Sequence, residues 1–247
     1  MGKIFAIVNQ NGGVGKTTTT SYLAKAFTAK QKKVLIIDLD PLSSLSSNYD
    51  FSSLGTKSLT ECMEGRATLN ECIFAVEENK LFMALGGKCL IGFEIAAIYS
   101  PNREKVLSTL LSCIKGNYDY ILIDTPSSLG LLSMNALTAA DEVIIPVKTD
   151  YLSFRGLELI LDSIEKTKSR KRGNPDLKVL GVVATMYRKS TKDHQDILSL
   201  IEKAAPLLGI IKESVEASKS DVDGIPAVIS SPKSEVAASY IKIAKEI

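Results

Sequence analysis

The chain has 247 residues, of which 30 are Lys or Arg and 28 are Asp or Glu, so its formal net charge is +2 at pH 7. This balance lacks the overall basic excess of many nucleic-acid-binding proteins, and any such surface would have to be local. No apolar run reaches the roughly 18 residues that cross a bilayer, and no small-residue cleavage site follows the apolar N-terminal stretch, so neither a membrane span nor a secretory signal is expected.

Short apolar runs rich in β-branched residues alternate with helix-like stretches along the chain. The runs are continuous, as expected for strands covered on both faces. The predicted strands are 4–8, 34–37, 120–123, 143–147 and 179–184. The predicted helices are 17–28, 103–114, 154–168, 193–204 and 234–247, and the Ser-rich segment 41–69 is expected to be a long loop followed by short helices. This alternation predicts one α/β domain over residues 1–247, a mostly parallel twisted sheet with helices on both faces.

The last predicted helix has apolar residues near helical spacing, at Val236, Tyr240, Ile243 and Ile247. Such a stripe packs against a sheet in most globular proteins. A helix that lies on a membrane surface is the alternative, but the polar face of this segment is not strongly basic. We therefore expect it to be part of the core.

Four cysteines and one histidine are present in the whole chain. No Cys-x-x-Cys pair occurs, so a disulfide framework and a Cys/His zinc site are both poor interpretations. We expect four scattered, buried thiols in a reducing cytosol, at Cys62, Cys72, Cys89 and Cys113.

A glycine-rich segment, Asn-Gly-Gly-Val-Gly-Lys-Thr-Thr at 11–18, follows the first predicted strand and opens the first predicted helix. Gln10 stands where Gly-x-x-x-x-Gly-Lys-[Ser/Thr] begins with glycine, so that pattern fails at one position. Glycines let consecutive amides surround phosphate oxygens, a lysine reaches the β- and γ-phosphates, and a threonine hydroxyl ligates Mg²⁺. A glycine turn that only caps the helix is the alternative. The predicted nucleotide-binding residues here are Gly12, Gly13, Val14, Gly15, Lys16, Thr17 and Thr18.

Two predicted strand ends carry carboxylates. Asp38 and Asp40 follow strand 34–37, and Asp124 follows strand 120–123. In a parallel sheet these ends open on the same edge as the glycine-rich loop. Asp124 therefore suits the Mg²⁺ shell through a water, Asp40 suits orientation of the attacking water, and Asp38 would support them. Either Asp124 or Asp40 could instead only cap the following turn or helix.

These motifs resemble the deviant Walker A ATPases of the ParA/MinD family, and most of all the small, Soj-type ParA partition proteins. The resemblance covers nearly the whole chain. The segments that carry it are 9–10, 12–18, 38–41, 118–130, 135–137 and 185–187. The last of these is similar to the strand end beside the adenine, which adds Met186 to the expected nucleotide-binding residues.

The resemblance implies a P-loop NTPase fold with ATP and Mg²⁺ as cofactors. It further implies a cytoplasmic ATPase of chromosome or plasmid partition that closes on ATP into a sandwich homodimer. Such a dimer binds DNA non-specifically, associates with the nucleoid and hydrolyses ATP slowly until a ParB-like partner stimulates it. Lys16 and Mg²⁺ would stabilise the charge of the in-line attack, and Asp40 would position the water. The chain begins almost at its first strand, so we expect no N-terminal DNA-reading extension.

Three positions depart from the family pattern. Asn11 aligns with the signature lysine that reaches the partner's phosphates, so we expect Asn11 to occupy a catalytic position. Because asparagine carries no charge to offset that of the γ-phosphate, we also expect slow turnover. Glu213 and Glu216 align with arginines used for DNA and would repel phosphates. Leu42 replaces the usual glutamine two residues after Asp40.

Basic residues near the expected nucleotide site offer a candidate DNA contact at Arg188, Lys189 and Lys192. A second basic cluster occupies 166–172. It is equally explained by compensation of the dipole at a helix C-terminus and by a DNA-binding surface.

Other functional classes remain to be weighed. Because of Asn11, the chain could be a hydrolysis-impaired nucleotide switch. A MinD-like membrane-cycling protein would need a basic amphipathic tail, which residues 244–247 do not supply, so stable membrane association is not expected. An iron–sulfur reductase of the nitrogenase iron-protein type is excluded, because no cysteine follows Asp124.

Overall fold

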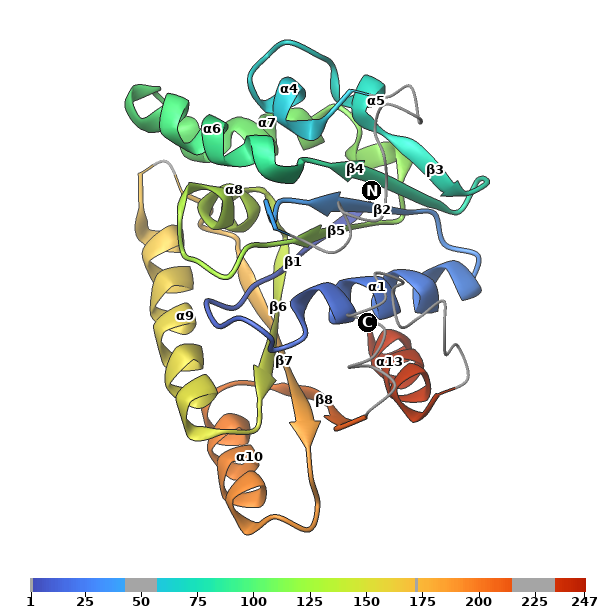
Figure 1. Cartoon of the computed structure of the whole chain (residues 1–247), viewed down its shortest axis with the longest axis vertical. Coiled ribbons are helices and arrows are strands. Elements are labelled where there is room, and N and C mark those ends of the chain that lie inside the picture. Colours follow the sequence, from blue (N-terminus) through green and yellow to red (C-terminus); the bar gives the residue numbers. More distant parts are fainter. Residues whose placement is uncertain (1, 43–56, 172, 215–233) are drawn as a thin grey trace.

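The structure is a computed structural model, and it describes residues 2–42, 57–171, 173–214 and 234–247. Within these ranges eight strands form one sheet (Figure 1). They are β1 (Lys3–Ile7), β2 (Val34–Asp38), β3 (Phe74–Glu77), β4 (Leu81–Leu85), β5 (Tyr120–Asp124), β6 (Glu142–Lys148), β7 (Lys178–Tyr187) and β8 (Leu207–Lys212). Their order across the sheet is β3-β4-β2-β5-β1-β6-β7-β8, and every neighbouring pair is parallel except β3 with β4. The predicted α/β fold is therefore confirmed.

The five predicted strands are β1, β2, β5, β6 and β7, which form the centre of the sheet. The strands β3, β4 and β8, which lie toward the two edges of the sheet, were not predicted. The antiparallel β3–β4 hairpin does not follow the strand–helix alternation. In β8, Gly209 interrupts the apolar run and most side chains are only half-buried, so its pattern is weaker.

Helices cover both faces of this sheet. Figure 1 shows α8 and α9 on one side and α1 with α13 on the other. The helices are α1 (Lys16–Ala29), α4 (Leu59–Met63), α5 (Leu69–Cys72), α6 (Leu90–Ala96), α7 (Val106–Ser112), α8 (Leu131–Ala139), α9 (Tyr151–Ser169), α10 (Lys192–Ala204) and α13 (Glu235–Glu246). Short 3-10 turns are η1 (Gly87–Cys89), η2 (Ala97–Tyr99), η3 (Arg103–Lys105) and η4 (Lys115–Asn117). The predicted helix 103–114 is therefore η3 followed by α7.

The continuous apolar strands serve two cores. In β1, Ile4 and Ala6 face the core under α7, α8 and α9, whereas Phe5 and Ile7 face the core under α1 and α13. Successive side chains of a strand point to opposite faces, so a strand covered on both sides must be apolar at every position. This is the physical reason that these runs could be recognised in the sequence.

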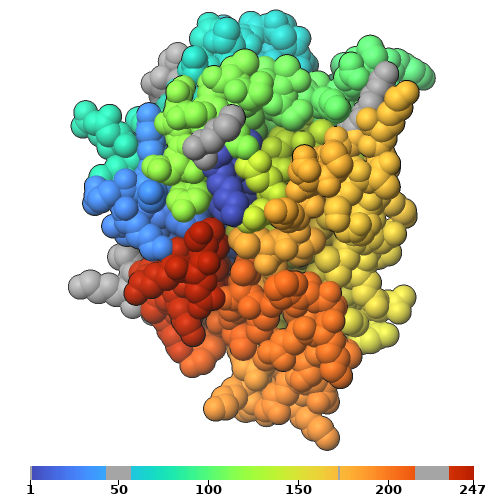
Figure 2. Space-filling model, turned by 180° about the vertical axis from the view of Figure 1, so that it is seen from behind, coloured from blue at the N-terminus to red at the C-terminus, as the bar shows by residue number. Residues whose placement is uncertain are grey.

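The closing helix α13 packs into the core as expected. Val236, Tyr240 and Ile243 are buried against α1 and β8, and Ser234 caps the helix by accepting from the Ala237 amide at 3.2 Å. In Figure 2, α13 lies between the blue N-terminal part of the chain and the orange residues of α10 and β8. Among the described residues, no helix is both long and apolar enough to span a bilayer.

The cysteine expectation is correct for two residues and wrong for two. Cys62 and Cys72 are buried in α4 and α5, where the Cys72 thiol donates to the carbonyls of Ser58 and Thr68. Cys89 and Cys113 are exposed, because η1 and the end of α7 lie at the surface. All four thiols are free.

Candidate nucleotide-binding site

The carboxyl ends of β2, β5 and β1 form the edge at which the predicted site residues meet. In the parallel register, Asp38 of β2 is paired with Asp124 of β5, and Ile7 of β1 is also paired with Asp124. The chain leaves β1 at this edge and enters the glycine-rich loop, which leads directly into α1. Strand register therefore places two carboxylates beside the loop.

The loop is anchored at both ends by side chains. The Asn9 amide nitrogen donates to the Pro146 carbonyl at 2.6 Å, and its oxygen accepts from the Asn11 amide at 2.9 Å. On the other side, the Thr185 hydroxyl donates to the Val14 carbonyl at 2.9 Å. The loop is thereby fixed to β6 and β7.

Glycines are required at two places in this loop. Gly13 and Gly15 have φ angles of 68° and 89°, in the left-handed region that side chains disfavour. Gly15 directly precedes α1, and its carbonyl accepts from the Thr19 amide at 2.8 Å. The amides of the first turn of α1 therefore face the loop without intrahelical partners, as an anion-binding helix N-terminus requires.

Lys16 lies across the mouth of the loop. Its ammonium donates to the Asn11 carbonyl at 3.1 Å and to the Ser127 hydroxyl at 2.8 Å, and the residue is only 6% exposed. Burial lowers the Lys16 pKa, and the nearby carboxylates of Asp124 and Asp40 oppose that change. Two neutral oxygens hold this buried cation, so phosphate oxygens would be stronger partners in the same place.

Thr17 and Asp124 join the helix start to the sheet edge. The Thr17 hydroxyl donates to one Asp124 oxygen at 2.7 Å, and the Thr20 hydroxyl donates to the other at 3.3 Å. Asp124 is fully buried, and burial together with the neighbouring Asp38 raises its pKa to about 8. A cation bound beside this buried carboxyl would stabilise its ionised form.

These oxygens suit Mg²⁺, which prefers hard oxygen ligands and retains several waters and phosphate oxygens. Within the described part of the chain, no group of three or more His, Cys, Asp or Glu residues could hold a metal ion. The residues present therefore fit a magnesium ion that takes most of its ligands from nucleotide and water. They do not fit a metal held by protein alone.

Asp40 lies at the rim of the same site. Its amide donates to Asp38 Oδ1 at 3.0 Å, and its own Oδ1 accepts from the Leu42 amide at 3.0 Å. The carboxylate is close enough to Lys16 to raise the pKa of that ammonium. Leu42 itself is strongly exposed. The structure thus brings Asp40, Asp124 and Lys16 together, as the sequence predicted.

A hollow of about 110 Å³ adjoins the loop on the side away from Asp124. It is lined by the predicted residues Gly13, Gly15, Thr18 and Met186 and also by residues of β8, α13 and the segment after β8, among them Glu213 and Tyr240. Tyr240 accepts or donates a hydrogen bond with Thr19 at 2.8 Å, so α13 closes this side of the site.

The candidate DNA contacts lie beyond this hollow and are exposed. Arg188 forms an ion pair with Glu213, so its charge is largely cancelled, whereas Lys189 and Lys192 have no carboxylate partner among the described residues. Glu216 lies outside the described residues. In the second basic cluster, Lys166 pairs with Asp162. Lys168 in turn pairs with Glu165, and position 172 is not described.

The Asn11 side chain packs against its own chain. A Cβ atom at Gly156 of α9 would lie 2.9 Å from Asn11 Nδ2, so the Asn11 amide lies close to α9 at a position that has no side chain. Its carbonyl is the acceptor for Lys16. The structure therefore places Asn11 at the loop, with its side chain directed to α9.

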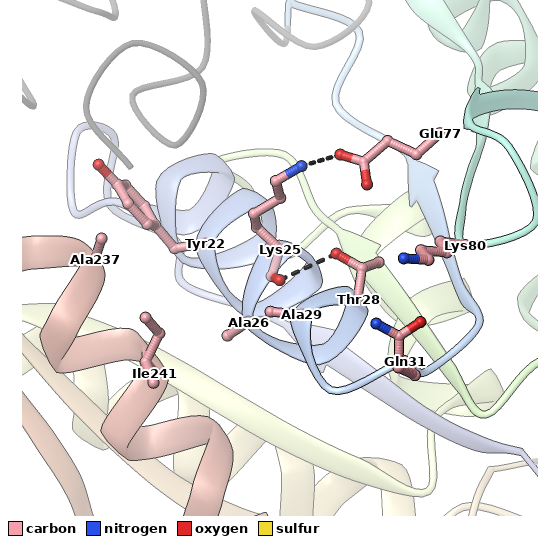
Figure 3. Close-up of a pocket in the computed structure, with 10 residues that line it drawn as sticks. All are labelled: Tyr22, Lys25, Ala26, Thr28, Ala29, Gln31, Glu77, Lys80, Ala237 and Ile241. Atoms are coloured by element: carbon pink, nitrogen blue, oxygen red, sulfur yellow. Dashed lines mark hydrogen bonds and ion pairs between the residues drawn. The ribbon is translucent and has the colours of Figure 1, made fainter. Parts of the chain in front are cut away.

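A second hollow, of about 300 Å³, lies between α1, α13 and the β3–β4 turn (Figure 3). Lys25 is paired with Glu77 there, and the Thr28 hydroxyl donates to the Lys25 carbonyl at 3.0 Å. None of the predicted site residues lines this hollow. It is therefore separate from the candidate nucleotide site.

Comparison with known proteins assigns the family. A family model described as "AAA domain" matches residues 2–179. The Bacillus subtilis protein "Sporulation initiation inhibitor protein Soj" is 34% identical over 251 residues, covering 100% of this chain and 98% of the relative. The chain belongs to the ParA/Soj family. "Chromosome-partitioning ATPase Soj" of Treponema pallidum is 33% identical to this ParA/Soj-family chain. The match covers 100% of this chain and 97% of the relative.

A solved structure agrees with this assignment at the level of fold. The Mycobacterium smegmatis protein titled "Cobyrinic Acid a,c-diamide synthase", with bound ATP analogue and magnesium, has a TM-score of 0.84 and 29% identity. The match covers 99% of this ParA/Soj-family chain and 93% of the other chain. The predicted P-loop NTPase fold is thus confirmed.

Several residues of the site were not assigned a role from the sequence. Ser127 and Thr185 lay inside the matching segments, and their hydroxyl groups at strand ends were the available signal. Asn9, a polar residue at the end of an apolar strand, was a signal of the same kind. Tyr240 gave none, because a tyrosine in an amphipathic helix indicates only burial. Its position depends on how α13 packs on α1.

Proposed function

We propose that this protein is a ParA-like partition ATPase that binds MgATP on the loop 12–18. The observation that carries the proposal is the Thr17–Asp124 hydrogen bond of 2.7 Å beside the buried Lys16 ammonium. This arrangement joins a phosphate-binding helix start to a strand-end carboxylate. The named activity of the Treponema relative and the ligands of the Mycobacterium structure support the same assignment.

The residues would divide the work as follows. Backbone amides from Gly12 to Thr18 would surround the phosphates, and Lys16 would exchange the Asn11 carbonyl and Ser127 for phosphate oxygens. The Thr17 hydroxyl, with Asp124 through a water, would hold Mg²⁺. When bound, Mg²⁺ would neutralise part of the phosphate charge. The hollow beside Met186 would receive the base and ribose.

Hydrolysis requires a water aligned with the terminal phosphate. Asp40 at the rim is the group that we assign to accept a hydrogen bond from this water. The water oxygen then bonds to the γ-phosphorus as the bond to the bridging oxygen breaks, giving ADP and phosphate. Lys16 stabilises the charge that moves onto the oxygens. Asn11 carries no charge, so we expect slow turnover.

By analogy with its relatives, the protein would work in chromosome or plasmid partition. We propose an ATP-dependent sandwich homodimer that cycles on non-specific DNA and responds to a ParB-like partner. Lys189 and Lys192 are the available cations for DNA, and Arg188 joins them only when it leaves Glu213. The similarity to the chromosome-partitioning ATPase Soj of Treponema pallidum supports the partition role.

The second candidate is a nucleotide-dependent switch with little or no hydrolysis. The observation that favours it is the uncharged Asn11 side chain, which is directed to α9. This residue provides no cation to meet a partner's phosphate. Phosphate release by the purified protein separates the two functions. Measurements without additions, with DNA, and with DNA plus partner should all give zero for the switch.

The binding site itself is tested by calorimetry. MgATP should bind the wild-type protein, and Lys16→Ala should abolish that binding because the buried ammonium is its main cationic contact. Lys168→Ala, an exposed lysine on α9, is the matched control and should bind normally. Retained affinity in Lys16→Ala would refute the site assignment.

A further inference from the structure

The loop 186–191 connects β7 to α10 and begins at the wall of the nucleotide hollow. Its first residue, Met186, has a φ angle of 53°, a left-handed conformation that is uncommon for a side chain of this type. Such a conformation persists only where its surroundings hold it. The hydrogen bonds around Met186 therefore indicate what fixes this wall.

Thr149, at the end of β6, holds the strand end from one side. Its amide donates to the Thr185 carbonyl at 3.1 Å. Its hydroxyl lies 3.4 Å from the same carbonyl and 3.3 Å from the Met186 carbonyl. Thr149 is buried, so few other partners compete for this hydroxyl.

His194, the single histidine of the chain, holds the loop from the other side. It lies in the first turn of α10, and its Nδ1 accepts from the Arg188 amide at 3.2 Å. The same nitrogen lies 2.8 Å from the Thr149 hydroxyl. One imidazole nitrogen thus joins β6, the loop and α10.

The shared nitrogen allows two hydrogen-bond arrangements. When Nδ1 has its lone pair, the Arg188 N–H and the Thr149 O–H share that single lone pair as donors. When Nδ1 carries the ring proton, as it does in one of the two neutral tautomers, it donates to the Thr149 oxygen, the Thr149 hydroxyl turns to the Met186 carbonyl, and Arg188 N–H loses its acceptor. A backbone amide without a partner is costly, so the second arrangement favours movement of the loop.

We propose that His194 is a positioning residue of the base site: with the lone pair of its Nδ1 it fixes the loop 186–191 and holds Met186 at the hollow. This inference rests on the proposed function, because it assigns a base to that hollow. It adds a determinant of nucleotide affinity that touches neither phosphate nor metal.

Charged groups of both signs surround the imidazole. Lys148 and Asp150 flank Thr149 and pair with each other at 3.3 Å, and Glu213, which pairs with Arg188, also interacts electrostatically with the imidazole. The Tyr187 ring centroid lies 6.3 Å from that of His194. Lys189, Lys192 and Asp193 are exposed nearby in the chain.

Hydrogen exchange in the nucleotide-free protein tests the loop directly. At one fixed pH near 7.5, His194→Ala should exchange the amides of 186–191 at least about fivefold faster than wild type, the effect of one lost hydrogen bond. His194→Asn should keep the wild-type rate, since its Oδ1 can accept from Arg188 in place of Nδ1. Asp196→Ala, an exposed change on α10, is the control. Unchanged exchange in His194→Ala would overturn the inference.

Affinity for MgADP tests the consequence. His194→Ala should bind at least about fivefold more weakly at pH 7.5, and His194→Asn should bind within about twofold of wild type. Equal affinity of His194→Ala and wild type at pH 7.5 would overturn the positioning role.

The two levels of the inference fail separately. If the wild-type protein fails to bind MgADP, the proposed function is refuted. The hydrogen exchange still decides whether His194 fixes the loop. If wild type binds but His194→Ala binds equally well, the proposed function stands and the positioning role is refuted. Should His194→Ala not fold, Thr149→Val and His194→Asn give the same contrast.

Discussion

The Thr17 hydroxyl donates to the Asp124 carboxylate at 2.7 Å, joining the first turn of α1 to the end of β5. The proposed magnesium site depends on this contact, because it brings the helix N-terminus and the strand-end carboxylate together. The raised pKa of Asp124, about 8, shows that the nucleotide-free protein holds a carboxyl that favours its neutral form.

The first prediction concerns Asp124 and pH. Since the folded pKa lies above that of an unfolded aspartate, the native state binds the additional proton, and the stability of the nucleotide-free protein should fall as pH rises from about 4 to about 8. Asp124→Asn removes this penalty. It should be more stable than wild type at pH 8, by on the order of 5 kcal/mol, and show little gain at pH 4.

Chemical denaturation at several pH values, without nucleotide, checks this. The same variant should lose the stabilisation that MgATP gives to wild type, because the carboxylate is needed only when the cation is bound. Asp196→Asn, at an exposed carboxylate, is the control and should show neither effect. Equal stability of Asp124→Asn and wild type at pH 8 would contradict the prediction.

The second prediction concerns the missing charge at Asn11. Asn11→Lys should increase ATP-dependent dimerisation or turnover, with turnover rising about tenfold or more, because an ammonium in a dry interface can stabilise developing phosphate charge. Light scattering with ATP and phosphate release measure the two effects. Asn11→Gln gives the matched extension without charge. If neither quantity changes in Asn11→Lys, this position does not have the role of the family's lysine.

The third prediction concerns the ion pair of Arg188 with Glu213. Glu213→Gln removes the competing charge and should strengthen DNA binding at saturating ATP. The salt dependence should also become steeper, by about one counterion per released arginine. DNA titrations at several salt concentrations measure both effects. In an Arg188→Ala background the Glu213→Gln change should have little effect, and an equal effect in both backgrounds would argue against the pair.

The fourth prediction concerns α13. Tyr240→Phe leaves the buried Thr19 hydroxyl without its partner at 2.8 Å and should cost about 1 kcal/mol of unfolding free energy. Tyr240→Ala also removes the ring stacked on Tyr22, with centroids 5.1 Å apart, and should cost about 3 kcal/mol or more. Denaturant unfolding gives both values.

A truncation that lacks residues 240–247 should therefore fail to fold stably. If that truncated protein instead remained stable and lost binding to anionic vesicles, the membrane-cycling alternative would be favoured over a structural α13. The exposed Ile241 provides a control, since Ile241→Ala should cost little.

The central strands could be predicted because burial on both faces leaves an unbroken apolar run, as in residues 34–37 of β2. Edge elements such as β8 have weaker patterns, because side chains there meet solvent on one side. Local chemistry also marked the phosphate loop, since Gly13 and Gly15 provide left-handed conformations that the bend requires. Buried thiols were over-predicted at Cys89 and Cys113, because composition says nothing about which side of a short helix faces out.

By itself the sequence determined the alternation of the central strands with helices, the glycine-rich loop and the acidic strand ends, since each depends on residues close together in the chain. Only the tertiary structure decided that Asn11 packs on Gly156, that Glu213 pairs with Arg188, and that His194 meets Thr149. These contacts join residues far apart in the sequence. Each depends on the direction of side chains across packed elements, which no local pattern encodes.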